Sequence, residues 1–258
     1  MHGSIHESEQ YSPRSIRRYE KIFGADFLSS GGGDTTKAIC ETLDIRGGTR
    51  VLDVGSGLGG SAFYMSRAYG AVVTGVDILP RMVDLATERA KERGVSGVTF
   101  VHGDILELDL PSAAYDLVYS RDALLYVEDK AALFRKLYRL LAPRGRLFVS
   151  DYARGADPLS DEFTDYVQEA GYYLHEPAAY GDIVKAAGFD EVVVVDKTDA
   201  FVAVMQREME AIRGNRQGPE HDGLENADRD YLLKRWESKT RWCKAGDMKW
   251  GHFYARRP

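Results

Sequence analysis

Short apolar runs alternate with amphipathic stretches from Thr49 onward, and this alternation constrains the possible fold more than any other feature of the sequence. The apolar run in "TRVLDVGSG" leads into the helical pattern of "GGSAFYMSRAYG", and the same rhythm returns as far as "RLFVSDYA". Strands separated by helices of this length predict an α/β fold, in which helices cover both faces of a mostly parallel sheet. Ligands of such sheets bind beyond the carboxyl ends of the strands, so the residues after each strand are the candidates for a site.

The rhythm changes after Arg154, where "DEFTDYVQEAGYYL" and "AAYGDIVKAAG" have helical patterns and "DEVVVVDKT" reads as a strand. A longer helix is expected from Asp199 to about Arg213, followed by more helix and a last strand, "KWGHFYARR". No segment has the composition of a linker, so we predict a single domain over residues 1–258. It divides into an N-terminal segment (1–37), a core (38–154) and a C-terminal part with extra helices and the last strands (155–258).

Composition excludes several classes of partner for this 258-residue chain. A formal net charge of -6 gives no general attraction for the nucleic-acid backbone, so we expect no nucleic-acid partner. The sequence shows no apolar run of about 20 residues and no signal-peptide pattern, so we expect no membrane partner. Two cysteines make neither a disulfide framework nor a metal-binding spacing. We therefore expect no metal and a reducing, cytoplasmic setting.

Glycines and acidic residues gather at the predicted strand ends. Gly55, Gly57 and Gly60 in "VLDVGSGLGG" satisfy the three-glycine pattern of dinucleotide-binding loops, which alone is weak evidence, since any turn close to a ligand uses glycine. Asp77 ends the second strand, where a carboxylate can accept both ribose hydroxyls of a nucleoside. Asp104 ends the third, where it can accept from an adenine amino group.

Asp53 precedes the first of these glycines by two residues, and one isoleucine follows each strand-end aspartate, Ile78 after Asp77 and Ile105 after Asp104. The two isoleucines can hold a purine ring between them. Aspartates that merely cap the following helices are the alternative interpretation. An adenine-dinucleotide oxidoreductase explains the glycines and Asp77, but it has no use for Asp53 or Asp104.

This pattern, from Val51 to Ser150, resembles the class I methyltransferases that bind S-adenosylmethionine (SAM) and release S-adenosylhomocysteine. The resemblance implies a Rossmann-like, seven-stranded sheet whose last strand is antiparallel, which suits "KWGHFYARR". A narrower resemblance rests on "QYSPRSIRRYEKIFGADFLSSGG", "LDVGSGLGG", "SRDALLYV", "SDYA" and "DEFTDYV". These segments resemble the phosphoethanolamine N-methyltransferases, especially the short, single-domain protozoan kind, from about Gln10 to Ala255.

The narrower resemblance implies an N-terminal helical lid over both ligands and a small-molecule substrate, and we expect a monomer or weak dimer. It implies cofactor contacts for Leu28, Ser29 and Arg121, besides Asp53, Gly55, Gly57, Asp77, Ile78, Asp104 and Ile105. Substrate contacts are implied for Gln10, Tyr11, Tyr19 and Asp122, and contacts with the phosphate for Tyr152, Tyr166, Tyr172 and Lys239. Tyr11 and Asp122 take the catalytic positions, together with Tyr126, where the family has a histidine.

Two positions depart from that family. Tyr126 replaces the catalytic histidine, whose pKa lies nearest neutrality, and a tyrosine with a pKa near ~10 is a poor base. Ala170 stands where the family has an arginine that binds phosphate, and a lysine replaces such a fork only as a point charge. Arg18 or Arg154 are candidates to compensate for the arginine, and His175 is a candidate for the missing base.

Three interpretations stay open at the level of sequence. The chain can be a slower phosphobase methyltransferase that uses a Tyr-Tyr-Asp arrangement. It can instead methylate another small amine, an amino acid, or an oxygen or sulfur nucleophile that has no phosphate. It can also be a SAM-binding protein that has lost activity. An amine must lose a proton before it attacks a sulfonium, and a pocket rich in tyrosine suits a small cation.

Overall fold

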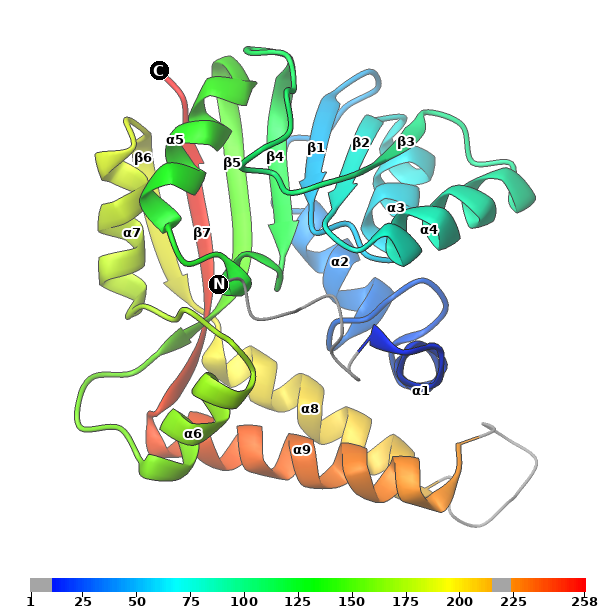
Figure 1. Ribbon diagram of the computed structural model, residues 1–258, viewed down its shortest axis with the longest axis vertical. Coiled ribbons are helices and arrows are strands. Elements are labelled where there is room, and N and C mark those ends of the chain that lie inside the picture. Colours follow the sequence, from blue (N-terminus) through cyan, green and yellow to red (C-terminus); the bar gives the residue numbers. More distant parts are fainter. Residues whose placement is uncertain (1–10, 215–223) are drawn as a thin grey trace.

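The structure, a computed structural model, describes residues 11–214 and 224–258. Seven strands form one sheet in the order β3-β2-β1-β4-β5-β7-β6 (Figure 1). They are β1 (Arg50–Val54), β2 (Val72–Asp77), β3 (Val98–His102), β4 (Tyr115–Arg121), β5 (Leu141–Arg154), β6 (Asp190–Asp196) and β7 (Met248–Arg256). The pairs from β3 to β5 are parallel, and β7 runs antiparallel to both β5 and β6. The expected α/β sheet with an antiparallel last strand is confirmed.

Helices cover both faces of this sheet because successive strand side chains point to opposite faces and both sets are apolar. On β1, Val51 packs with α2 (Gly32–Cys40) and α3 (Gly60–Tyr69). Its neighbour Leu52 packs with α5 (Lys130–Leu140) and α7 (Pro177–Ala186) on the other face. The helix α4 (Pro80–Glu92) lies against β2 and β3. The helix α2 extends past residue 37, so the lid segment continues into the core without a break.

A second apolar cluster lies beyond the carboxyl ends of the strands. It joins α1 (Pro13–Phe23) to α6 (Asp161–Glu169), α8 (Thr198–Gly214) and α9 (Asn226–Ala245). The helices α8 and α9 lie side by side along the lower part of the molecule in Figure 1. Together these elements enclose the end of the sheet where a ligand is expected.

Local signals in the sequence set the boundaries of the elements near the site. Ser12 caps α1 by accepting a hydrogen bond from the Ser15 backbone N–H (3.2 Å), and Pro13 is the first helical residue. The apolar stretch "YDLVYSRDALLYV" forms a strand only over its first seven residues, which are β4. The chain leaves β4 at Asp122, whose φ is 53°, and continues as a short 3-10 helix, η3 (Leu124–Tyr126).

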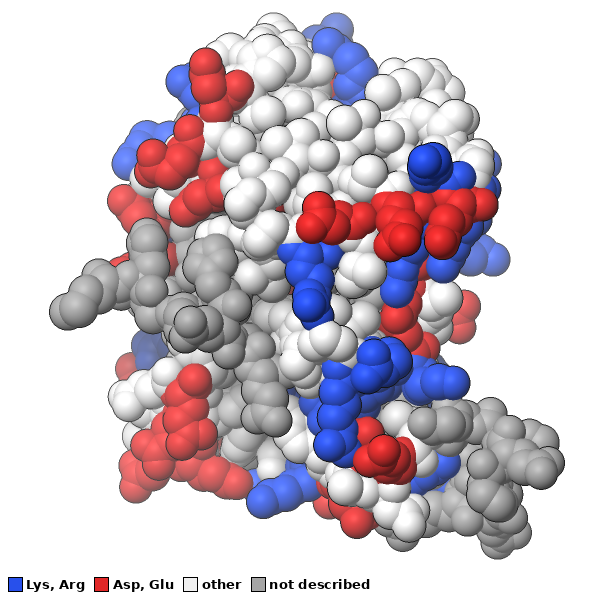
Figure 2. Space-filling model, turned by 45° about the vertical axis from the view of Figure 1, so that its right-hand side comes forward, with Lys and Arg blue, Asp and Glu red and all other residues white. Residues whose placement is uncertain are grey.

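Ion pairs hold α1 on both of its sides. Arg18 Nη1 lies 3.3 Å from Asp228 Oδ1 on α9. On the opposite side, Arg89 Nη1 of α4 lies 2.6 Å from Glu20 Oε1 and 3.0 Å from Asp26 Oδ1. Figure 2 accordingly shows acidic and basic side chains next to one another on the flank that carries α1 and α4. The N-terminal helix is thus fastened over the end of the sheet.

No helix within residues 11–214 and 224–258 is long and apolar enough to cross a membrane. The same residues contain no group of three or more His, Cys, Asp or Glu side chains placed to hold a metal ion.

Candidate active site

A cavity of about 880 Å³ opens between the lid, the strand ends and α9. Its size is within the range of small-molecule sites, which is roughly 300 to 1,000 Å³. Most residues predicted from the sequence line it: Tyr11, Tyr19, Leu28, Ser29, Gly55, Gly57, Asp77, Ile78, Asp104, Ile105, Arg121, Asp122, Tyr126, Tyr152, Tyr172 and Lys239. One continuous space therefore contains both the positions expected for the cofactor and those expected for the substrate.

Two predicted residues lie elsewhere, and a third is not described. Gln10 falls outside the described residues. Tyr166 does not line the large cavity; it lies behind Tyr172, with the two ring centroids 5.7 Å apart. Asp53 lines a smaller, neighbouring cavity of about 50 Å³. Asp53 therefore lines the smaller cavity, whereas Asp77 and Asp104 line the larger one.

At Gly55 the glycine loop approaches its neighbour so closely that no side chain fits. Gly55 has φ 76°, and a Cβ on it would lie 2.2 Å from the Cβ of Ala123. Asp77 fixes the loop from β2, since Oδ2 accepts from the Gly57 N–H (2.8 Å) and Oδ1 from the Leu79 N–H (3.0 Å). Burial raises the pKa of Asp77 and these two N–H groups oppose the rise. Each oxygen keeps a second lone pair, so the carboxylate can still accept both hydroxyls of a ribose.

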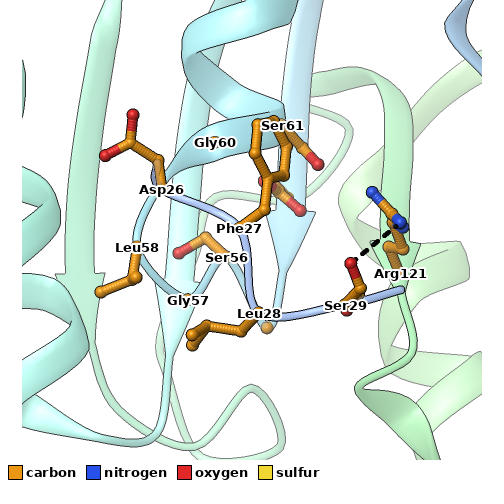
Figure 3. Close-up of a pocket in the computed structure, with 12 residues that line it drawn as sticks. Asp26, Phe27, Leu28, Ser29, Ser56, Gly57, Leu58, Gly60, Ser61 and Arg121 are labelled. Atoms are coloured by element: carbon orange, nitrogen blue, oxygen red, sulfur yellow. Dashed lines mark hydrogen bonds between the residues drawn. The ribbon is translucent and has the colours of Figure 1, made fainter. Parts of the chain in front are cut away.

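The smaller cavity contains buried oxygens without partners. In Figure 3 the segment from Asp26 to Ser29 crosses the loop from Ser56 to Ser61. Neither Asp53 Oδ2 nor Ser56 Oγ has a hydrogen-bond partner among the described residues. Burial raises the pKa of Asp53 to about 7. Buried acceptors without partners are costly, and the ammonium group of SAM is a donor that can satisfy them. The residues present therefore fit SAM.

The far end of the large cavity suits the adenine. Asp104 Oδ1 accepts from the Leu106 N–H (2.9 Å), which fixes the carboxylate at the end of β3. Ile78 and Ile105 both line the cavity, as expected for two side chains that hold a purine between them.

The Arg121 side chain donates its hydrogen bonds within the protein. Its guanidinium donates to the backbone oxygens of Ser30 and Gly32 (2.8 Å for Gly32) and to Thr36 Oγ1 (2.7 Å). It therefore holds the segment that joins the lid to the core, although it also lines both cavities. Glu208 on α8, which sequence reasoning missed, holds the same segment from the other side. Its Oε1 accepts from the Gly31 N–H (2.6 Å), and its Oε2 accepts from Trp236 Nε1 (2.5 Å).

Asp122 presents a buried carboxylate to the cavity. Its side chain is 5% exposed, and Oδ1 accepts from Ser150 Oγ (3.1 Å) and Trp250 Nε1 (2.8 Å). No side chain or backbone group of the described residues donates to Oδ2, which lies 4.0 Å from Arg121 Nε. Burial raises the pKa of Asp122, against the opposing effect of Arg121. The side chain is thus a fixed proton acceptor of increased basicity.

Two phenols meet in the same cavity. The Tyr11 and Tyr126 hydroxyl oxygens lie 3.2 Å apart. Tyr126 also packs edge-on against Tyr172, with ring centroids 5.2 Å apart. Burial raises the pKa of both Tyr11 and Tyr126, so both are neutral at physiological pH. Neutral phenols can orient a substrate by hydrogen bonds, but they are weak bases.

Lys239 supplies a buried cation. It is 7% exposed, and its Nζ donates to the Tyr152 hydroxyl at 2.9 Å. Burial lowers the pKa of Lys239 and Arg235 lowers it further. Sequence reasoning missed Arg235, which lines the cavity one helical turn before Lys239. Its i, i+4 spacing from Lys239 was the available signal, but most such pairs on helices face solvent.

The residues suggested as substitutes for the missing groups do not reach the cavity. Arg18 pairs with Asp228, and Arg154 pairs with Asp157 at 2.8 Å; neither lines the cavity. His175 does not line it either, and its ring packs against Tyr180 at 6.3 Å.

Comparison of the chain with known proteins identifies its family. Residues 52–149 match the methyltransferase domain profile. The chain is 36% identical to a phosphoethanolamine N-methyltransferase of Plasmodium falciparum, over 96% of this chain and 94% of the relative. It is 38% identical to phosphoethanolamine N-methyltransferase 3 of Arabidopsis thaliana over 97% of this chain and 51% of that protein, so it spans about half the length of the plant relatives.

The fold agrees with that of a solved relative. Haemonchus contortus phosphoethanolamine N-methyltransferase 2, determined with phosphomonomethylethanolamine and S-adenosylhomocysteine, superposes with a TM-score of 0.93 and 31% identity. The match covers 97% of this chain and 58% of the nematode chain. By its similarity along almost the whole length of the Plasmodium relative, the chain belongs to the phosphoethanolamine N-methyltransferase family of SAM-dependent methyltransferases.

Proposed function

We propose that this chain transfers a methyl group from SAM to the amino nitrogen of phosphoethanolamine or its methylated derivatives, toward phosphocholine. One observation carries the proposal. A single cavity joins the nucleoside acceptors Asp77 and Asp104 to the buried side-chain carboxylate of Asp122 and to a buried cation, Lys239. A substrate with an ammonium group at one end and a phosphate at the other matches these two charges. The substrate class named for the Plasmodium and Haemonchus relatives supports the same assignment.

The cavity residues divide the chemistry between them. The methyl group comes from the sulfonium of SAM, so the amino nitrogen must offer a free lone pair in line with the transfer. Asp122 Oδ2 accepts the proton from the ammonium, and burial makes this carboxylate more basic than an ordinary aspartate. The neutral Tyr11–Tyr126 pair orients the nitrogen by hydrogen bonding, and the nearby aromatic rings favour a cation in the ground state.

Tyr126 and Ala170, which replace the family's histidine and arginine, favour a second candidate function. This is methylation of a small amine or other nucleophile that carries no phosphate. The direct test is a product assay with SAM and either phosphoethanolamine, ethanolamine or glycine, followed by mass spectrometry. Mono-, di- or trimethylated phosphobase is the expected product. S-adenosylhomocysteine formed only with an acceptor lacking phosphate would establish the second function instead. SAM binding with no turnover on any acceptor would indicate a protein that has lost activity.

We propose a cytoplasmic protein that acts as a monomer or weak dimer on a small molecule. Cys40 and Cys243 are both buried free thiols, which supports a reducing compartment.

Substitution of Tyr126 by histidine, the residue that the family has at this position, tests whether position 126 takes part in proton transfer. We expect Tyr126→His to raise kcat on phosphoethanolamine by up to ~10-fold, because a histidine with a pKa near ~6.5 exchanges protons at neutral pH. The rate measured against pH should then show an added inflection near that value. Tyr126→Phe, which keeps the ring, is the control and should lower kcat. Unchanged rate and unchanged pH profile in the histidine variant would remove position 126 from proton transfer.

A further inference from the structure

Arg235 and Lys239 form a pair of cations on the wall of the large cavity. They lie four residues apart on α9, a spacing that puts both side chains on one face of the helix. Aromatic rings surround them. The Arg235 guanidinium carbon lies 5.8 Å from the Tyr166 ring centroid, and Lys239 Nζ lies 4.3 Å from that of Tyr152. Two like charges thus share one helix face inside an aromatic environment, where they repel each other.

No carboxylate of residues 11–214 or 224–258 lies within ion-pair distance of either cation. Arg235 Nη1 donates only weakly to the Tyr231 hydroxyl, at 3.4 Å, and Lys239 donates to a neutral phenol. Arg18, on the neighbouring lid helix, is by contrast balanced by Asp228. A half-buried guanidinium beside a buried ammonium, with no described carboxylate within ion-pair distance, is stable only at a cost, and an anion removes that cost.

We propose that Arg235 binds the phosphate group of the substrate together with Lys239. The inference rests on the proposed function for the identity of the substrate. Arg235 supplies the planar fork that binds two phosphate oxygens at once, and Lys239 supplies a point charge. Ala170 lines the same cavity, and its methyl side chain leaves space that an arginine at that position would fill. The guanidinium for phosphate therefore comes from α9 in this chain.

Calorimetry on the full chain with S-adenosylhomocysteine bound measures the role of Arg235 directly. The titrants are phosphoethanolamine and inorganic phosphate. We expect Arg235→Ala to weaken the binding of both by ~10-fold or more, and Arg235→Lys to weaken it less, since the charge remains without the fork. Lys234→Ala is the matched control. Lys234 is the exposed residue next to Arg235 on α9, so this variant loses the same charge on the solvent side of the helix. In all three variants, the affinity for S-adenosylhomocysteine and the melting temperature should equal those of the wild type.

The outcomes separate this inference from the proposed function. Wild-type phosphate affinity in Arg235→Ala, confirmed with Arg235→Gln, would overturn the role of Arg235 even if phosphoethanolamine is methylated. Phosphate binding that depends on Arg235, in a protein that methylates no phosphobase, would refute the proposed substrate and leave the anion site standing. Partial recovery of phosphate affinity in Arg235→Ala combined with Ala170→Arg would support a shared location for the two guanidinium groups.

Discussion

Asp122→Asn is expected to lower kcat on phosphoethanolamine by about 100-fold or more, because general-base catalysis typically contributes 10²- to 10⁴-fold. Asparagine can still accept from Ser150 and Trp250 through its amide oxygen, so the local fold is preserved. It cannot take a proton from the substrate ammonium. Steady-state kinetics measures the loss, and calorimetry should show that S-adenosylhomocysteine binds as in the wild type.

The pH dependence gives the same prediction a second test. Burial raises the pKa of Asp122, so the active carboxylate is lost as pH falls through a value above the ordinary ~3.9 for aspartate. The acid limb of kcat/KM should therefore lie above that value in the wild type. Ser150→Ala is the matched control, since loss of one hydrogen bond to the carboxylate raises the pKa further and moves the limb to higher pH. A wild-type profile in Asp122→Asn would assign the base elsewhere.

Asp77→Asn is expected to weaken SAM binding by about 30- to 100-fold. Hydrogen bonds to a charged group contribute roughly 1.5 to 3 kcal/mol each, and the asparagine amide nitrogen cannot accept from a ribose hydroxyl. The substitution also leaves either the Gly57 or the Leu79 N–H without its acceptor. Calorimetry with SAM and S-adenosylhomocysteine measures the effect.

Asp84→Asn removes the same charge from an exposed position on α4 and should leave the affinity unchanged. If Asp77→Asn bound SAM as tightly as that control, the ribose would have another acceptor. Retention of NAD by the wild-type protein would point instead to the dinucleotide interpretation.

The sheet and the cofactor end of the cavity were predictable from local pattern. Side chains after parallel strands converge at one edge of the sheet whatever the helices between them do, so Asp77 and Asp104 had to lie near the glycine loop. The antiparallel last strand was implied by the resemblance to class I methyltransferases, and β7 confirms it. The roles of individual residues there stay predictions, because a close approach of side chains does not establish binding.

The substrate end of the cavity was predictable only through the resemblance to the family. That resemblance predicted which positions from Tyr11 to Lys239 line the site, but not the residues with which they form hydrogen bonds or ion pairs. Local sequence gave no reason to prefer Arg235 over Arg18 or Arg154, since all three lie among charged and aromatic neighbours. Tertiary packing determines which arginine is in the site. Arg18 pairs with Asp228, which is 210 residues away in the chain, whereas Arg235 lines the cavity.

The sequence by itself determined the order of strands and helices and the loop at their carboxyl ends, because these depend on short-range periodicity and on glycine. Only the tertiary structure decided that Glu208 holds Gly31, and that Tyr11 meets Tyr126. Those contacts depend on how α1, α8 and α9 are rotated over the sheet. That rotation is set by the summed packing of apolar residues far apart in the chain, which no local pattern contains.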